Sequence, residues 1–175
     1  QRQMCIRDRR IGGLYAGEHQ HRDFGTFQIY HKGPLAIASG VYDGTNSHYG
    51  SAHWQEYYQQ TLAHNGLLIT DPNEGASVRD GGQRLPNGGT APATLADLGA
   101  SQRMGTVTAW EFGPNAWSPA YSYLAGDITD AYSNKVQQVS RAMVMLNLQD
   151  SNWPAAFVTF DPVSYTHLTL PTNGC

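Results

Sequence analysis

The sequence predicts an all-β protein, folded as an antiparallel β-sandwich. Seven short runs of alternating or β-branched apolar residues recur along the chain, and turns rich in glycine and proline separate them. The composition agrees, because 40% of the 175 residues are hydrophobic and the 19 glycines and 10 tyrosines suit a β-rich globular protein. A chain of this length is enough for one domain with a core of its own.

The first two predicted strands form a hairpin. The run GTFQIYHKG, over residues 25–33, alternates Phe27 and Ile29 with more polar neighbours and ends in a Lys-Gly turn signal. The run PLAIASGVY follows at once, over residues 34–42, so the two strands are expected to pair. The same criteria predict five further strands, over residues 64–72, 103–113, 122–129, 136–148 and 155–162.

Two segments depart from the strand pattern. Residues 51–63 are too short and too rich in aromatic side chains to found a helical core, so we expect a helical turn that crosses the end of the sheet. Residues 73–99 are rich in glycine and proline, and a loop of that length in a compact domain is usually functional or mobile. Large apolar residues on the predicted strands, among them Trp110, Met143 and Met145, are expected in the core.

Composition and charge exclude two classes of partner. The net charge of −3 and the lack of a long basic run argue against a nucleic acid. No apolar stretch approaches the ~20 residues that a membrane span needs. A charged content of only 14%, together with many aromatic side chains, suits a surface that handles sugars.

The two ends differ from the rest of the chain in composition and periodicity. The runs QMCIRDR near the start and VSYTHLTLPTN near the end resemble translated sequencing-adapter read-through. Residues 1–9 and 163–175 are therefore expected to be non-biological, and residues 10–162 to be a piece of a longer protein. Because Cys5 and Cys175 both lie in these ends, we expect no disulfide and no thiolate metal site.

Two histidines one residue apart carry the strongest chemical signal. In the run EHQHRDFG, His19 and His21 would share a face if the segment were a strand, so both imidazoles could point into the same space. Imidazole suits zinc, and His64 in the run AHNG is the obvious third donor, at the start of a strand that could lie beside the first.

Other interpretations of the pair stay open at this point. Histidines near a turn often do no more than satisfy backbone groups. Asp23 suits two roles equally well, either as the partner that orients one imidazole or as a cap for the turn before Gly25.

An ordered series of motifs extends this signal. The chain contains H-x-H-x-D-x-G at residues 19–25, A-H-N at 63–65 and D-G-G-Q-R at 80–84, and it continues through YLAGDITDAYSNKVQQVSRAMVML. In this order, the series resembles the heparinase II/III-like family of bacterial polysaccharide lyases, over essentially all of residues 18–162. A single H-x-H would be weak evidence, whereas the ordered series is specific.

The resemblance implies a fold, an activity and partners. In that family, the resembling region is a β-sandwich that follows an (α/α) toroid, so the chain is expected to be a fragment of a toroid-plus-sandwich lyase. Such enzymes cleave uronic-acid polysaccharides, such as heparin, heparan sulfate or alginate, by β-elimination. The resemblance therefore implies an acidic polysaccharide as substrate, the toroid as partner domain, and a periplasmic or secreted location in a bacterium.

The resemblance also implies roles for individual residues. β-Elimination needs a base for the C5 proton, stabilisation of the enolate-like charge and an acid for the leaving oxygen. By resemblance, His19 faces the substrate and is the candidate catalytic residue. His21 is the candidate ligand of a structural zinc ion, with His64 as its partner ligand.

The sequence departs from the family pattern at one zinc ligand. The remaining ligand in the family is an aspartate in a segment that usually reads LAIDSG, whereas this chain reads LAIASG, with Ala38 at that position. Alanine cannot coordinate a metal, and two histidines with water bind zinc more weakly than three protein ligands do. Either Asp43 substitutes or the metal is lost, and the five intervening residues, past Gly40, argue against Asp43.

Four more residues are candidates for contact with the substrate. Tyr49 and His53 lie next to the expected cleft, where aromatic faces stack on pyranose rings. Arg79 and Arg84 flank the run DGGQ and could form bidentate pairs with a carboxylate or sulfate. A structural role, in which Arg84 ties down the long loop, is an equal alternative.

Three functions follow from these residues. The first is the β-sandwich part of a polysaccharide lyase, which is expected to be inactive alone because the toroid supplies the tyrosine acid/base and further catalytic groups. The second is a carbohydrate-contacting β-sandwich without activity of its own. The third is a cupin-like metalloprotein, which ranks last because no glutamate follows the histidine pair in the run RDFGTFQ.

Overall fold

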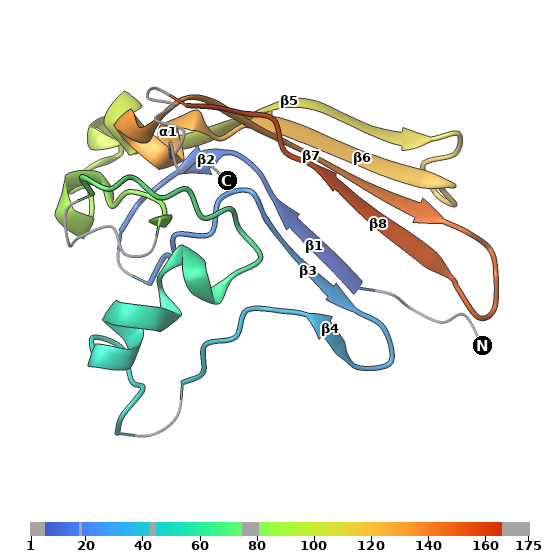
Figure 1. The fold of residues 1–175 in the computed structure, drawn as a ribbon, viewed down its shortest axis with the longest axis horizontal. Helices are drawn as coiled ribbons and strands as arrows, with labels where there is room; N and C mark the ends of the chain where they lie inside the picture. The colour runs from blue at the N-terminus through green and yellow to red at the C-terminus, as the bar shows by residue number, and fades with distance from the viewer. Residues whose placement is uncertain (1–5, 18, 43–44, 75–80, 166–175) are drawn as a thin grey trace, which may run out of the picture.

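Two antiparallel sheets, packed face to face, form the fold of residues 6–17, 19–42, 45–74 and 81–165, which are the residues that the computed structural model describes (Figure 1). The smaller sheet has the order β1-β3-β4, with strands β1 (Ile6–Arg10), β3 (Thr26–Tyr30) and β4 (Pro34–Ala36). The larger sheet has the order β2-β5-β6-β7-β8, and β9 pairs with β7. Its strands are β2 (Gly13–Leu14), β5 (Arg103–Gly113), β6 (Tyr121–Asp127), β7 (Val136–Asn147), β8 (Ala155–Phe160) and β9 (Val163–Tyr165). The predicted all-β sandwich is confirmed.

The core lies between the sheets and extends under the loops at one end. Inward residues of β7 alternate with more exposed ones, as expected for a strand that packs on one face. Phe27 on β3 packs against Phe157 on β8, with ring centroids 4.5 Å apart. The largest fully buried apolar side chains are Phe24, Met104, Ile128, Tyr132, Val139 and Met143.

Most of the predicted strands form. The expected hairpin is β3 and β4, in which Ile29 lies opposite Ala36 and Lys32 takes a positive φ of 57° in the turn. The sequence predicts its second strand over residues 34–42, but β4 ends at Ala36. The strand β5 has the predicted bounds, and β6, β7 and β8 differ from the predicted ranges by one or two residues at their ends. Met143 and Met145 are buried as expected.

The predicted strand over residues 64–72 is wrong. Side chains from residues 132–141 satisfy the backbone of this segment in place of a neighbouring strand. They are Tyr132, Lys135 and Arg141, which donate to the carbonyls of Leu67, Ile69 and Asn65. The apolar run is real, but its carbonyls bond to distant side chains and its Ile69 N–H bonds to the Gly81 carbonyl, which the local pattern could not reveal.

The prediction that Trp110 is buried is also wrong, because its side chain is 69% exposed. The smaller sheet has only the three strands β1, β3 and β4 among the described residues, so it cannot cover the whole of the larger sheet. Its strand β1 lies against β6 and β7, where Arg9 donates to the carbonyls of Ser122 and Met143. β2 pairs only with Arg103 and Gly105 of β5, so the rest of β5 lies at the edge of the larger sheet, and every residue from 106 to 112 is exposed.

Helical elements are short and lie between the strands. Residues 51–63 contain the π-helix η1 (Trp54–Tyr58) and the 3₁₀-helix η2 (Thr61–Ala63), which confirms the expected helical turn. The long loop contains the 3₁₀-helices η4 (Pro86–Gly89) and η5 (Leu95–Asp97). The remaining helices are η6 (Ala100–Gln102), α1 (Thr129–Tyr132) and η7 (Ser133–Lys135). Within the described residues, no helix is both long and apolar enough to cross a membrane.

The strands β1, β2 and β9 were not expected from the sequence. All five residues of β1 pair with β3, and β9 pairs with the start of β7. Both strands overlap the ends that are expected to be non-biological, residues 1–9 and 163–175. The origin of those ends stays a prediction.

One buried arginine joins the larger sheet to two loops. Arg141, on β7, is 5% exposed, and its Nε and Nη2 donate to the two carboxylate oxygens of Asp161 at 2.6 and 2.9 Å. Its Nη1 donates to the carbonyl of Gly25 at 2.5 Å and to that of Asn65 at 3.0 Å. The bidentate pair fixes the guanidinium plane, so the remaining N–H groups are aimed at both loops at once.

We predict that Arg141→Ala lowers the free energy of unfolding by about 3–5 kcal/mol, because it leaves a partly buried carboxylate and two carbonyls without their donor. Urea denaturation followed by circular dichroism measures the change. Arg103→Ala, which removes an exposed arginine, is the matched control and should change it by about 0.5 kcal/mol or less. Equal effects of the two substitutions would contradict the assignment.

Candidate functional site

The segment that carries the histidine pair is a loop rather than a strand. Residues 19–25 connect β2 to β3, and their main chain bonds to other loops: the Arg22 N–H donates to the Gln59 carbonyl at 2.9 Å. Gly25, with a φ of +74°, turns the chain into β3, and a side chain there would collide with Ile128. The expectation that His19 and His21 share a strand face is therefore wrong.

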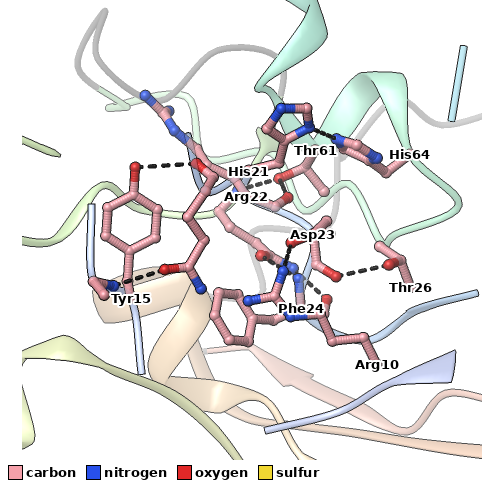
Figure 2. A network of polar contacts seen from close by, with 12 residues as sticks. Arg10, Tyr15, His21, Arg22, Asp23, Phe24, Thr26, Thr61 and His64 are labelled. Carbon is pink, nitrogen blue, oxygen red and sulfur yellow. Dashed lines mark hydrogen bonds and ion pairs between the residues drawn. The ribbon is translucent and has the colours of Figure 1, made fainter. Parts of the chain in front are cut away.

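A buried threonine and a buried glutamine hold this loop in place. The Thr61 hydroxyl donates to the Arg22 carbonyl at 2.8 Å and accepts from the Gln83 N–H at 2.9 Å (Figure 2). The Gln83 side chain accepts from the Phe24 N–H at 3.0 Å and donates to the Phe24 carbonyl at 2.5 Å. The amide thus satisfies both backbone groups of Phe24, as a neighbouring strand would. The glutamine of the D-G-G-Q-R motif, Gln83, therefore holds the backbone of the histidine-bearing loop in place.

Asp23 ties the loop to the end of β1. Its carboxylate pairs with Arg10, whose guanidinium also lies 4.1 Å from the ring centroid of Phe24. Its carbonyl accepts a hydrogen bond from the Thr26 hydroxyl at 2.7 Å (Figure 2). Burial lowers the pKa of His21, and the nearby Asp23 carboxylate partly opposes that shift.

The structure brings His21 and His64 together, as the sequence predicts. Figure 2 shows the two imidazoles facing each other, with 3.2 Å between Nδ1 of His21 and Nε2 of His64. His64 comes directly after η2, and the His21 ring lies edge-on to Tyr58, with centroids 4.7 Å apart. Burial lowers the pKa of both histidines, so both imidazoles are neutral near pH 7 and keep a nitrogen lone pair.

The spacing of two of the three zinc ligands that the family implies would suit a zinc ion. Two nitrogens bound at 2.0–2.1 Å to a tetrahedral ion lie about 3.3 Å apart, close to the spacing of this pair. The third position does not fit. The Ser39 N–H donates to the Ala63 carbonyl at 2.8 Å, which brings Ala38 beside His64, but a methyl group cannot coordinate. Asp43 lies outside the described residues, among which no group of three metal-binding side chains occurs.

His19 has different surroundings from His21. It lies in an exposed turn, and its ring stacks on Tyr49 with centroids 4.2 Å apart and a tilt of 38°. Tyr49 is 42% exposed and in turn contacts the buried Trp54, with centroids 4.5 Å apart. The three rings form a stack that is anchored on η1 and ends in two solvent-facing aromatic side chains.

The structure places the remaining candidates in two regions. His53 precedes η1, and its ring lies 5.5 Å from that of Tyr57 and 6.3 Å from that of Tyr58, which in turn contacts His21. Arg84 instead donates from all three of its nitrogens to the carbonyls of Asp130, Ser101 and Arg103, at 2.5, 2.9 and 2.6 Å. These are the contacts expected if Arg84 ties down the long loop. Arg79 lies outside the described residues.

Sequence reasoning missed Tyr58, the aromatic ring that joins the candidates. It contacts the rings of His21, His53 and Tyr42, with centroids 4.7, 6.3 and 4.9 Å away. Gly40 lies flat against this ring and leaves no room for a Cβ atom. The sequence holds a glycine, Gly40, and two tyrosines in residues 51–63, but nothing in it indicates that Gly40 packs against Tyr58.

We predict that the protein becomes less stable as the pH falls from 7 to 5.5. The unfolded chain protonates both histidines near the ordinary pKa of about 6.5, whereas burial keeps His21 and His64 neutral in the folded state. Stability from these groups is therefore present above that pKa and is lost as the pH falls towards the lowered folded values. Thermal unfolding across this range measures the effect. His64→Gln should flatten the pH dependence, and an unchanged dependence in that variant would contradict the account.

Comparison with known proteins agrees with the site. The family model described as Heparinase II/III-like, C-terminal, matches residues 7–153 of this chain. A search of the curated proteins finds no match. The match covers most of the chain, including the histidine pair, the A-H-N segment and the D-G-G-Q-R motif. The chain therefore belongs to the heparinase II/III-like family, in which it corresponds to the C-terminal domain.

Proposed function

We propose that this chain is the β-sandwich part of a polysaccharide lyase that cleaves uronic-acid polysaccharides by β-elimination, and that His19 contacts the reacting uronate. Family membership gives the class of enzyme. One observation supports the role of His19: its ring is exposed and stacked on Tyr49, whereas His21 turns inward to His64. Only the first of the two histidines is thus open to a ligand of polysaccharide size.

The chemistry of β-elimination matches an exposed imidazole. A base removes the C5 proton of the uronate, the electron pair forms the C4–C5 double bond, and the C4–O bond breaks as the leaving oxygen takes up a proton. An imidazole can take the C5 proton or donate its N–H to the carboxylate as negative charge develops there. The stack on Tyr49 limits rotation of the His19 ring, so the group that meets the substrate is held in one orientation.

The substrate is proposed to be acidic, of the heparin, heparan sulfate or alginate type. Tyr49 offers an aromatic face beside His19 on which a pyranose ring can stack, and His53 lies in the neighbouring aromatic cluster. Arg79 is proposed as a partner for substrate carboxylate or sulfate. An (α/α) toroid domain is proposed to supply the remaining catalytic groups, in a protein that is periplasmic or secreted.

A carbohydrate-contacting sandwich without activity is the second candidate. The two solvent-facing rings of His19 and Tyr49 favour it, because exposed aromatic rings can hold a sugar without reacting with it. The cupin-like interpretation has no such support, since His19 and His21 have different ring partners and the family model assigns the chain elsewhere.

We predict that uronate oligosaccharides from alginate or heparan sulfate bind at the exposed stack. NMR titration of the chain should shift the His19 and Tyr49 ring signals, and both His19→Ala and Tyr49→Ala should weaken binding by about threefold to tenfold, as expected for loss of a stacking contact. His31→Ala, on the β3–β4 turn, is the matched control. Binding that His31→Ala weakens as much as the other two would contradict the assignment.

We predict that the isolated chain does not cleave these polysaccharides. β-Elimination needs an acid for the leaving oxygen, and that group is proposed to come from the toroid. Incubation with heparan sulfate or alginate should give no rise in the ultraviolet absorbance of unsaturated uronate. A rise that His19→Ala abolishes would show that the sandwich alone carries a complete catalytic set.

A further inference from the structure

The joint between the two histidine-bearing loops is already held by hydrogen bonds that need no metal. Arg22 bonds through its N–H to Gln59 at 2.9 Å and through its carbonyl to Thr61 at 2.8 Å. Arg141 then bonds the ends of both loops, at Gly25 and Asn65. These contacts fix the backbone positions of His21 and His64. The chain therefore needs no ion to bring the two imidazoles together.

The two imidazoles also satisfy each other. The 3.2 Å between Nδ1 of His21 and Nε2 of His64 is within hydrogen-bond range, so one nitrogen carries the hydrogen and donates it to the other. A zinc ion would need a free lone pair on both nitrogens, whereas in the direct bond one nitrogen carries the hydrogen and the lone pair of the other accepts it. The direct bond and the metal are therefore alternatives at this site.

The choice between the direct bond and a zinc ion depends on residue 38, which is an alanine. Its neighbour Ser39 bonds to the Ala63 carbonyl through both its N–H, at 2.8 Å, and its hydroxyl, at 3.2 Å. These bonds hold the residue before Ser39 next to the Ala63–His64 segment. By the family resemblance this is the position of the third ligand, and here it carries only a methyl group.

We propose that this chain holds His21 and His64 together by a direct imidazole–imidazole hydrogen bond, with no zinc requirement, and that a carboxylate at position 38 is sufficient to create a zinc site. The proposal rests on family membership and on these contacts, and not on lyase activity. It would therefore stand or fall separately from the proposed function.

The test compares the 175-residue chain with Ala38→Asp, each purified, incubated with ZnCl₂ and dialysed. The unaltered chain should retain no stoichiometric zinc, and EDTA should leave its Tm unchanged. Ala38→Asp should retain about one zinc ion per chain, and zinc should raise its Tm by about 5–10 °C in a way that EDTA reverses.

Ala38→Asn is the matched control, because its side chain has the shape of aspartate without the charge, and it should retain no zinc. Ala38→His supplies a second donor type should the aspartate variant fail to fold without metal. Stoichiometric zinc or an EDTA-sensitive Tm in the unaltered chain would overturn the proposal. So would a lack of zinc binding in both Ala38→Asp and Ala38→His.

Discussion

The Arg141 guanidinium is the contact on which the geometry of the site depends. It projects from the middle of β7, where a charged group is stable only if all its donors are paired. Those pairs are a carboxylate just after β8 and the carbonyls of Gly25 and Asn65. Gly25 ends the loop of His21, and Asn65 follows His64 directly. The need to pair one buried charge therefore holds both histidine-bearing loops against the larger sheet.

Because of this arrangement, the two histidines of the H-x-H pair, His19 and His21, have different surroundings and different roles. Thr61 and Gln83 fix the backbone directly after His21, at Arg22 and Phe24, so the ring of His21 is held inward against His64 and Tyr58. His19 lies two residues earlier in an exposed turn and stacks on Tyr49. Neutral, partly buried imidazoles suit a structural joint, whereas an exposed ring beside an aromatic face suits contact with a sugar.

Local pattern predicted the strands whose partners are their sequence neighbours, such as β3 with β4 and β6 with β7. It failed over residues 64–72, because carbonyls of that segment bond to side chains that lie about 70 residues later, and the Ile69 N–H bonds to the Gly81 carbonyl. The order of motifs was enough to pair His21 with His64. It could not place the rings around them, since Tyr58 and Tyr49 act through packing between loops, for which the sequence has no periodic signal.

The central claim is that His19 faces solvent while His21 and His64 share one hydrogen. Nitrogen-15 NMR of the histidine side chains, recorded on the 175-residue chain in EDTA near pH 7.5, tests it most directly. The account predicts a slowly exchanging imidazole N–H that couples His21 Nδ1 with His64 Nε2, and a His19 ring whose N–H exchanges rapidly with water. A rapidly exchanging, independent His21 ring, or a protected N–H on His19, would contradict it.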